Sequence, residues 1–209
     1  KTKWRVGTTH TVFRPFWDIY VQLDRTIHAA DMYLDVLHEL GVKELQHNGL
    51  EMFVSEEALQ TVNRFWLEKG VQTTEKLIGF NIGSDVATKR WALERFAQVA
   101  DAMIEKGYKP VFFGDEGDEE FVQEAVSNMK YTPIIATGAF SIGELAVALR
   151  RCGLLITNDS GPMYVAISQN VPVVALYGPS STKLYGPYTS NAIAVTAQPP
   201  CLGCAGRMK

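Results

Sequence analysis

The sequence lacks long apolar runs and blocks of basic residues, and these absences exclude several classes of protein. No apolar stretch approaches the roughly 20 residues of a membrane-spanning helix, and no signal-peptide pattern opens the chain. The formal net charge is -3, and no Lys/Arg cluster occurs, which argues against a nucleic-acid partner. We therefore expect a cytoplasmic protein that binds neither DNA nor RNA.

Cysteine and histidine are also scarce, which limits metal and nucleophile chemistry. Cys152 stands alone in an apolar setting, and Cys201 and Cys204 form a lone C-x-x-C with no further ligands that would complete a zinc or redox site. The histidines lie in the N-terminal part of the chain, at positions 10, 28, 38 and 47. We expect no disulfide framework, no metal site and no Ser-His-Asp or Cys-His nucleophile.

What the sequence does contain is a regular alternation of strand and helix patterns from residue 77 onward. Of the 209 residues, 46% are hydrophobic and 21% charged, as in an ordinary globular protein. The predicted strands are 77–81, 110–113, 133–136, 154–156, 171–177 and 192–195, and the predicted helices are 91–106, 119–129, 141–151 and one that follows residue 161. This alternation predicts an α/β fold with a doubly wound, parallel, Rossmann-like sheet over residues 71–209.

The first 76 residues follow a different pattern. Residues 5–7 resemble the end of a strand without neighbours, residues 28–40 predict a helix ended by Gly41, and Ser55 is placed to cap a helix over 56–69. This opening portion is too short to form a full domain alone. We expect residues 1–70 to be an incomplete N-terminal α/β portion.

The most informative segment runs from residue 153 to residue 166, where a buried strand leads directly into a helix. Asp159 and Ser160 are residue types that begin helices, Gly161 lets a ligand approach the backbone closely, and Pro162 suits a first helical turn. A capped helix without a ligand would have the same pattern. At the carboxyl edge of a parallel sheet, however, such a helix start binds phosphate through its N–H groups.

Three further loops fall on the same predicted edge. The first contains Gly83, Ser84 and Lys89, and a lysine there is suited to a diphosphate, although an isolated lysine is commonly only solvated. The second is acidic, and Asp118 is its best candidate for a ribose hydroxyl. The third places Phe140 where it could meet a base or simply pack in the core. Together these loops favour a metal-free site for a nucleoside diphosphate.

These motifs together resemble the bacterial ADP-heptose lipopolysaccharide heptosyltransferases of glycosyltransferase family 9. The likeness is carried by residues 83–91, 114–118, 141–144, 158–163 and 171–179, with looser agreement at 5–7 and 28–41. The resemblance implies a two-domain GT-B fold with a nucleotide-sugar donor in the C-terminal domain and a lipid-linked or oligosaccharide acceptor facing the N-terminal one. Residues 1–70 would then be a remnant of the acceptor-side domain with the interdomain region.

The resemblance also implies roles for individual residues. Lys89 with Asp159, Ser160 and Gly161 would hold the ADP diphosphate, Asp118 the ribose, and Phe140 would flank the adenine. The full set of implied donor-binding residues is Gly83, Ser84, Lys89, Asp118, Phe140, Asp159, Ser160, Gly161, Met163 and Tyr164. Heptose transfer would invert the anomeric centre and need no metal cofactor, and peripheral contact with the inner membrane would accompany a lipid acceptor.

Two departures from the family pattern matter. Tyr164 stands where the family usually has histidine, so a phenol replaces a ring that could carry charge near pH 7. Two parts of the family pattern have no counterpart here: the glycine-rich start with its catalytic acidic residue, and the last helices. We therefore expect a fragment or a protein with absent segments. A non-catalytic nucleotide-sugar-binding module and a sugar-nucleotide epimerase of similar shape remain the alternatives to a glycosyltransferase.

Overall fold

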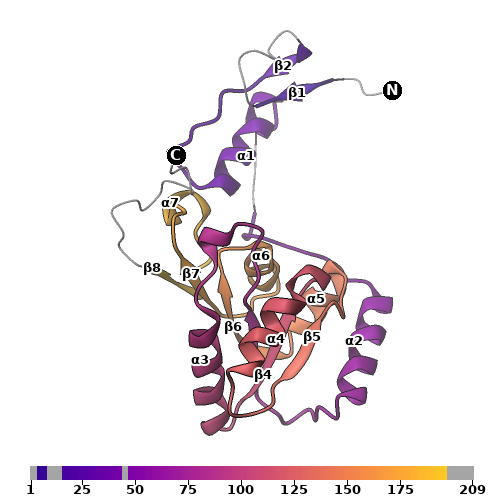
Figure 1. Cartoon of the computed structure of the whole chain (residues 1–209). Helices are drawn as coiled ribbons and strands as arrows, with labels where there is room; N and C mark the ends of the chain where they lie inside the picture. Colours follow the sequence, from indigo (N-terminus) through magenta and orange to yellow (C-terminus); the bar gives the residue numbers. More distant parts are fainter. Residues whose placement is uncertain (1–3, 9–15, 44–46, 197–209) are drawn as a thin grey trace. The chain divides into compact units, whose positions relative to one another are not determined.

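The computed structural model describes residues 4–8, 16–43 and 47–196 (Figure 1). The chain forms two compact units, one made of residues 1–48 with 183–186 and the other of residues 49–182 with 187–209. The predictions for His10, Cys201 and Cys204 lie outside the described residues.

The larger unit is built on one six-stranded parallel sheet with the order β5-β4-β3-β6-β7-β8. The strands are β3 (Leu77–Asn81), β4 (Lys109–Gly114), β5 (Ile134–Thr137), β6 (Cys152–Asn158), β7 (Val173–Tyr177) and β8 (Ala192–Thr196). The chain moves outward from β3 to β5, returns to the centre at β6, and continues outward to β8. This order confirms the predicted doubly wound sheet and places its switch point between β3 and β6.

Helices cover both faces of this sheet (Figure 1). On one face α3 (Leu93–Glu105) and α4 (Glu119–Ser127) pack over apolar side chains of the central strands, among them Phe80 and Phe112, which are stacked with ring centroids 5.2 Å apart. The other face carries α2 (Glu56–Glu68), α5 (Ile142–Leu149) and α6 (Gly161–Ser168). Two apolar layers therefore enclose the strands, as a buried parallel sheet requires.

Most helix ends follow the chemistry that the sequence predicts. The Ser55 hydroxyl accepts the Ala58 N–H at 3.2 Å, and Ser141 and Glu144 form the expected capping box at the start of α5. Gly107 has the positive φ of +83° that favours glycine after a helix. Helix α2 packs into the same apolar layer as α5, so it belongs to the larger unit although it precedes residue 70. The assignment of residues 1–70 to an acceptor-side domain stays a prediction.

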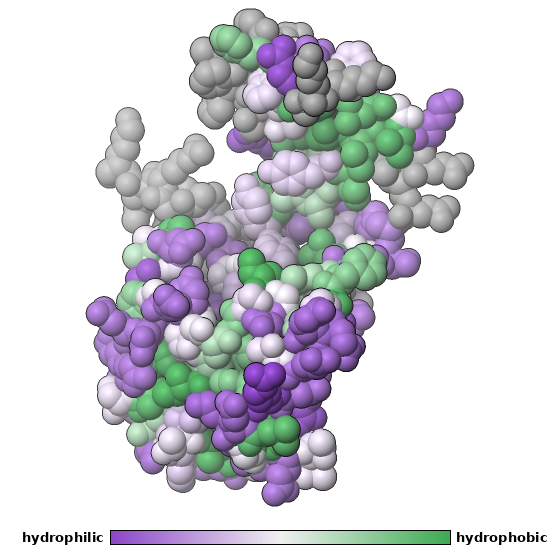
Figure 2. Space-filling view, turned by 90° about the vertical axis from the view of Figure 1, so that its right-hand side faces the viewer, coloured by the Kyte–Doolittle hydropathy of each residue, from purple (hydrophilic) through white to green (hydrophobic). Residues whose placement is uncertain are grey.

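The smaller unit contains β1 (Val6–Gly7), β2 (Ile19–Tyr20) and α1 (Ala29–Glu39), while the short α7 spans Thr182–Tyr185. The two strands pair in parallel. Among the described residues of this unit, Val21 and Met32 are the buried apolar side chains, whereas apolar residues such as Tyr33 are exposed. Figure 2 shows hydrophobic residues grouped on the smaller unit, and hydrophobic and hydrophilic residues mixed on the larger unit. The main core therefore lies around the six-stranded sheet.

Among the helices that the structure describes, none is both long and apolar enough to cross a membrane.

Candidate functional site

The switch point of the sheet brings the carboxyl ends of β3 and β6 side by side. Asn81 ends β3 and Asn158 ends β6, and the strands are paired up to Asn81 and Thr157. Ligands of doubly wound sheets bind in the crevice outside the strand ends at this point. A hollow of about 410 Å³ lies here, within the size range of small-ligand sites. Its lining includes Gly83, Ser84, Asp118, Phe140, Ser160 and Gly161.

The start of α6 is open toward a ligand because its N-cap residue is engaged elsewhere. Ser160 occupies the N-cap position without a side-chain capping bond. Its hydroxyl accepts from Asn81 Nδ2 at 3.0 Å and lies 3.3 Å from the Asn158 carbonyl, to which it donates. Gly161 is exposed and a Cβ added to it would meet no atom within 4 Å. The first turn of α6 thus combines a positive dipole end with unobstructed backbone, the arrangement that binds anions.

Asp118 lies against the glycines of two loops. A Cβ added at Gly83 would overlap the Asp118 carboxylate, and one at Gly114 would come within 2.8 Å of its Cβ. Asp118 Oδ2 accepts the Asp115 N–H at 3.3 Å and completes a capping box there. Partial burial, with the nearby charges of Asp115 and Asp85, raises the pKa of the Asp118 carboxyl. The glycines therefore make room for a carboxylate that faces the hollow.

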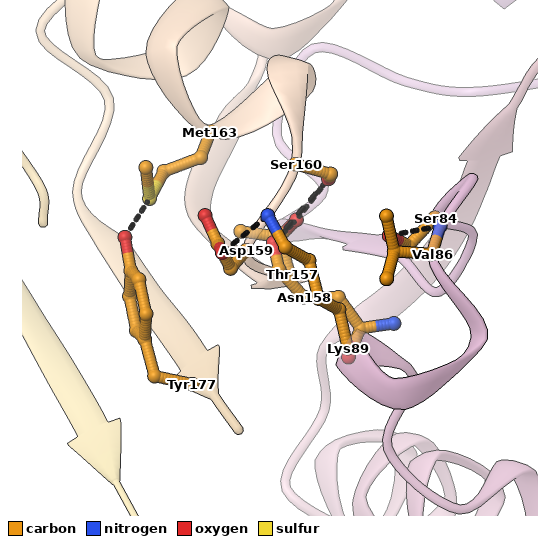
Figure 3. Close-up of polar contacts among 9 residues, drawn as sticks. All are labelled: Ser84, Val86, Lys89, Thr157, Asn158, Asp159, Ser160, Met163 and Tyr177. Atoms are coloured by element: carbon orange, nitrogen blue, oxygen red, sulfur yellow. Dashed lines mark hydrogen bonds and ion pairs between the residues drawn. The ribbon is translucent and has the colours of Figure 1, made fainter. Parts of the chain in front are cut away.

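Lys89 is paired with Asp159. Its Nζ lies 2.8 Å from Asp159 Oδ2, and the side chain extends from the loop after β3 toward the end of β6 (Figure 3). Asp159 has an exposed side-chain fraction of only 5%, against 25% for Lys89. Lys89 also lines a separate hollow of about 390 Å³ beside Trp91, Arg95 and Tyr177. The Lys89–Asp159 pair thus stands apart from the lining of the larger hollow, and the predicted phosphate role of Lys89 stays a prediction.

The remaining predicted residues differ in how far they reach the hollow. Phe140 lines it and also packs edge-on against Phe65 of α2, with ring centroids 4.8 Å apart. Met163 is fully buried, and its sulfur accepts a hydrogen bond from the Tyr177 hydroxyl at 3.3 Å (Figure 3). Tyr164 is half-buried and packs against the apolar layer under α5 and α6. The Met163 side chain thus supports the helix from its inner side, whereas the Tyr164 ring keeps part of its surface open to solvent.

No role was predicted from the sequence for the side chains of the polar residues at the ends of β3 and β6, although Asn158 lies in the segment that carries the family resemblance. Asn81, Thr157 and Asn158 are all buried. Across the switch point, the Asn81 amide donates to the hydroxyls of Thr157 and Ser160, and the Asn158 amide donates to the Ile82 carbonyl. A polar residue at the end of an otherwise apolar strand is the sequence signal that could have identified them. Such a residue is expected to be buried, and a buried amide needs a hydrogen-bond partner. Nor did the sequence predict that Arg90 would lie 4.1 Å above the Phe121 ring.

Within the described ranges, no group of three or more His, Cys, Asp and Glu side chains is arranged to hold a metal ion.

Comparison with known proteins places this chain in a family. The model of glycosyltransferase family 9 (heptosyltransferase) matches residues 10–209. Lipopolysaccharide heptosyltransferase 2 of Escherichia coli K12 is 32% identical over 148 residues, which cover 68% of this chain and 41% of that protein. Lipooligosaccharide heptosyltransferase 2 of Haemophilus influenzae is 28% identical over 141 residues, covering 65% of this chain and 41% of the relative. The chain thus spans about two-fifths of the length of these relatives.

Solved structures agree with this assignment. The family 9 glycosyltransferase of Veillonella parvula superimposes with a TM-score of 0.85 at 52% identity, covering 94% of this chain and 57% of that one. The E. coli ADP-heptose lipopolysaccharide heptosyltransferase II gives a TM-score of 0.78 at 25% identity, covering 92% and 61% respectively. These neighbours have the GT-B architecture that the sequence predicts. The chain belongs to glycosyltransferase family 9, the heptosyltransferase family.

Proposed function

We propose that the hollow at the switch point binds the ADP part of an ADP-heptose donor. The observation that carries this proposal is the first turn of α6, where Gly161 is exposed and Ser160 is held by Asn81 instead of capping the helix. In this arrangement the diphosphate lies at the helix start, the ribose reaches Asp118, and the base lies near Phe140. Names of similar proteins support the donor class, since an E. coli relative is described as an ADP-heptose heptosyltransferase.

In the proposed reaction heptose passes from ADP-heptose to the inner core of lipopolysaccharide or a related acceptor, with inversion. The departing ADP gains negative charge, which the N–H groups of α6 stabilise. The base that deprotonates the acceptor hydroxyl belongs to the part of the family pattern without a counterpart here. The same proposal places the protein in the cytoplasm, in peripheral contact with the inner membrane. Its acceptor is then lipid-linked or an oligosaccharide.

Titration calorimetry with ADP, UDP and GDP tests the donor proposal. We expect ADP to bind in the presence of EDTA, because a helix start supplies the charge complementarity that a cation would otherwise give. Binding that disappears with EDTA and returns with magnesium would contradict the metal-free site. Tighter binding of UDP or GDP than of ADP would contradict the choice of base.

One observation favours a second candidate, a nucleotide-sugar-binding module without transferase activity. Tyr164 stands in the first turn of α6, and its phenol does not gain charge near pH 7 as a histidine does. An assay of ADP release from ADP-heptose, with a lipopolysaccharide inner-core acceptor and the complete protein, separates the two. Donor binding without acceptor-dependent ADP release would favour the module.

A further inference from the structure

The Asn158 side chain contacts both ends of the loop that follows β3. Its Nδ2 donates to the Ile82 carbonyl at 2.6 Å, and its Oδ1 accepts the Trp91 N–H at 3.0 Å. Asn158 is completely buried, so neither group can exchange these partners for water. The segment from Ile82 to Trp91, here called the β3 loop, is therefore closed at its base by one carboxamide.

Other contacts hold the interior of the β3 loop. Arg90 Nε donates to the Ser84 carbonyl at 2.7 Å, and the Ser84 hydroxyl accepts the Val86 N–H at 3.3 Å. A Cβ added at Gly178, just after β7, would lie 3.0 Å from the Thr88 carbonyl, so these backbones approach closely. The loop has internal order, and Asn158 fixes where that ordered loop stands relative to β6.

We propose that Asn158 is a positioning residue that holds the β3 loop in register with the start of α6. Its main chain leads directly into Asp159, Ser160 and Gly161, while its side chain holds the loop that carries Gly83 and Ser84. One residue thus connects two parts of the hollow that come from different strands. This inference rests on the proposed nucleotide site and deepens it, because it says what keeps the site assembled before a ligand arrives.

The chemistry of the position requires a carboxamide. One side of the group must donate to a carbonyl and the other must accept from an N–H, which asparagine does and aspartate at neutral pH does not. In an Asn158→Asp variant the carboxylate would face the Ile82 carbonyl without a proton to share. In an Asn158→Ala variant both backbone groups would lose their partner.

Asp101 provides a matched control for the loss of stability. It is 7% exposed, and its carboxylate accepts from the Lys130 and Tyr131 N–H groups at 2.9 and 3.3 Å. It thus also links two backbone groups, but these precede β5 at the amino edge of the sheet, opposite the hollow. Asp101→Ala removes a similar pair of buried contacts without touching the β3 loop.

The experiment compares the parent chain with the Asn158→Ala, Asn158→Asp and Asp101→Ala variants by ADP calorimetry and by hydrogen exchange at a temperature where all are folded. If the β3 loop keeps its place only a tenth of the time, the Kd for ADP rises about ten-fold. We expect this rise, with faster exchange of the amides of residues 83–91, in both Asn158 variants. In Asp101→Ala the Kd stays within about two-fold of the parent.

An unchanged Kd in the Asn158 variants, or an equal rise in Asp101→Ala, would overturn the positioning role. If Asn158→Ala does not fold, Asn158→Asp carries the comparison. If the parent chain binds no nucleoside diphosphate, the proposed function fails, and exchange still tests this inference. Unchanged exchange of residues 83–91 in Asn158→Asp would then show that Asn158 does not hold the loop.

Discussion

Lys89 Nζ lies 2.8 Å from the Oδ2 atom of Asp159, which joins the loop after β3 to the residue immediately before the N-cap of α6. Since Asp159 is almost fully buried, its carboxylate depends on this neighbour for charge compensation. The lysine therefore has a structural role whatever it does for a ligand. Any effect of Lys89 on nucleotide binding has to be separated from its effect on Asp159.

Replacing Lys89 with methionine removes the charge while keeping much of the side-chain volume. Because Asp159 is then buried without a counter-charge, we expect the free energy of unfolding to fall by about 2 to 3 kcal/mol, somewhat less than for a fully buried pair. Urea unfolding measures this change. Adding Asp159→Asn to Lys89→Met should recover more than half of the loss, and a double variant as unstable as the sum of the two single ones would contradict the pairing.

The second prediction concerns Gly161. In a Gly161→Val variant the new side chain extends into open space at the start of α6, so we expect the Kd for ADP to rise at least about ten-fold, or 1.4 kcal/mol. Gly143→Val is the matched control, since Gly143 also lies in the first turn of a helix and has open space around it. Calorimetry measures the Kd for ADP of both variants. Equal Kd values for Gly161→Val and Gly143→Val would place the ligand away from α6.

The raised pKa of Asp118 predicts a pH-dependent stability difference. Burial and the charges of Asp115 and Asp85 outweigh the Asp115 N–H hydrogen bond and the Arg90 charge, so the pKa of the folded carboxyl lies above the usual unfolded value of about 3.9. Its protonated form thus contributes stability below about pH 4, and that contribution is lost as the pH rises through the folded pKa. Asp118→Asn should be more stable relative to the parent at pH 7 than at pH 4.

Urea unfolding of the parent and Asp118→Asn at several pH values between 4 and 7 tests this sign. The difference in unfolding free energy between the two proteins could fail to change with pH, or could change in the opposite direction. Either result would show that the fold does not raise the pKa of the Asp118 carboxyl.

Tyr164→His tests the placement of the first turn of α6 over the ligand. Near pH 8 the imidazole is neutral, and we expect the ADP affinity to remain within a few-fold of the parent. Toward pH 6 a ring with a pKa of about 6.5 gains charge beside the phosphates, so the affinity should increase. Tyr164→Phe is the control, because it cannot titrate in this range. If the two variants show the same pH dependence, residue 164 does not face the diphosphate.

Local features of the larger unit could be predicted from the sequence because they depend on neighbouring residues. The strand Leu77–Asn81 was predicted with the same bounds, and the capping box of Ser141 and Glu144 was predicted from residues three apart. The doubly wound architecture followed from the alternation of strands and helices. The order of strands in the sheet required the structure, since several orders satisfy the same alternation.

The internal connections of the site could not be predicted in this way. Asn158 reaches Trp91 and Ile82 across 67 and 76 residues of sequence, and no local pattern specifies which buried amide meets which backbone group. Six of the predicted donor-binding residues line one hollow, but Lys89 pairs with Asp159 and Met163 is enclosed in the core. Proximity along one sheet edge was predictable, whereas the side-chain partners were not.

We expect ADP to bind at the switch point with its diphosphate at the start of α6. Titrating the isotope-labelled chain with ADP and following the backbone amide signals by NMR tests this placement most directly. The amide signals of Gly83, Ser84 and Gly161 are expected to shift with a common Kd. Those of Tyr108 and Gly153, around the hollow at the opposite edge of the sheet, are expected to stay unchanged. Shifts confined to the opposite edge, or no response at Gly161, would contradict it.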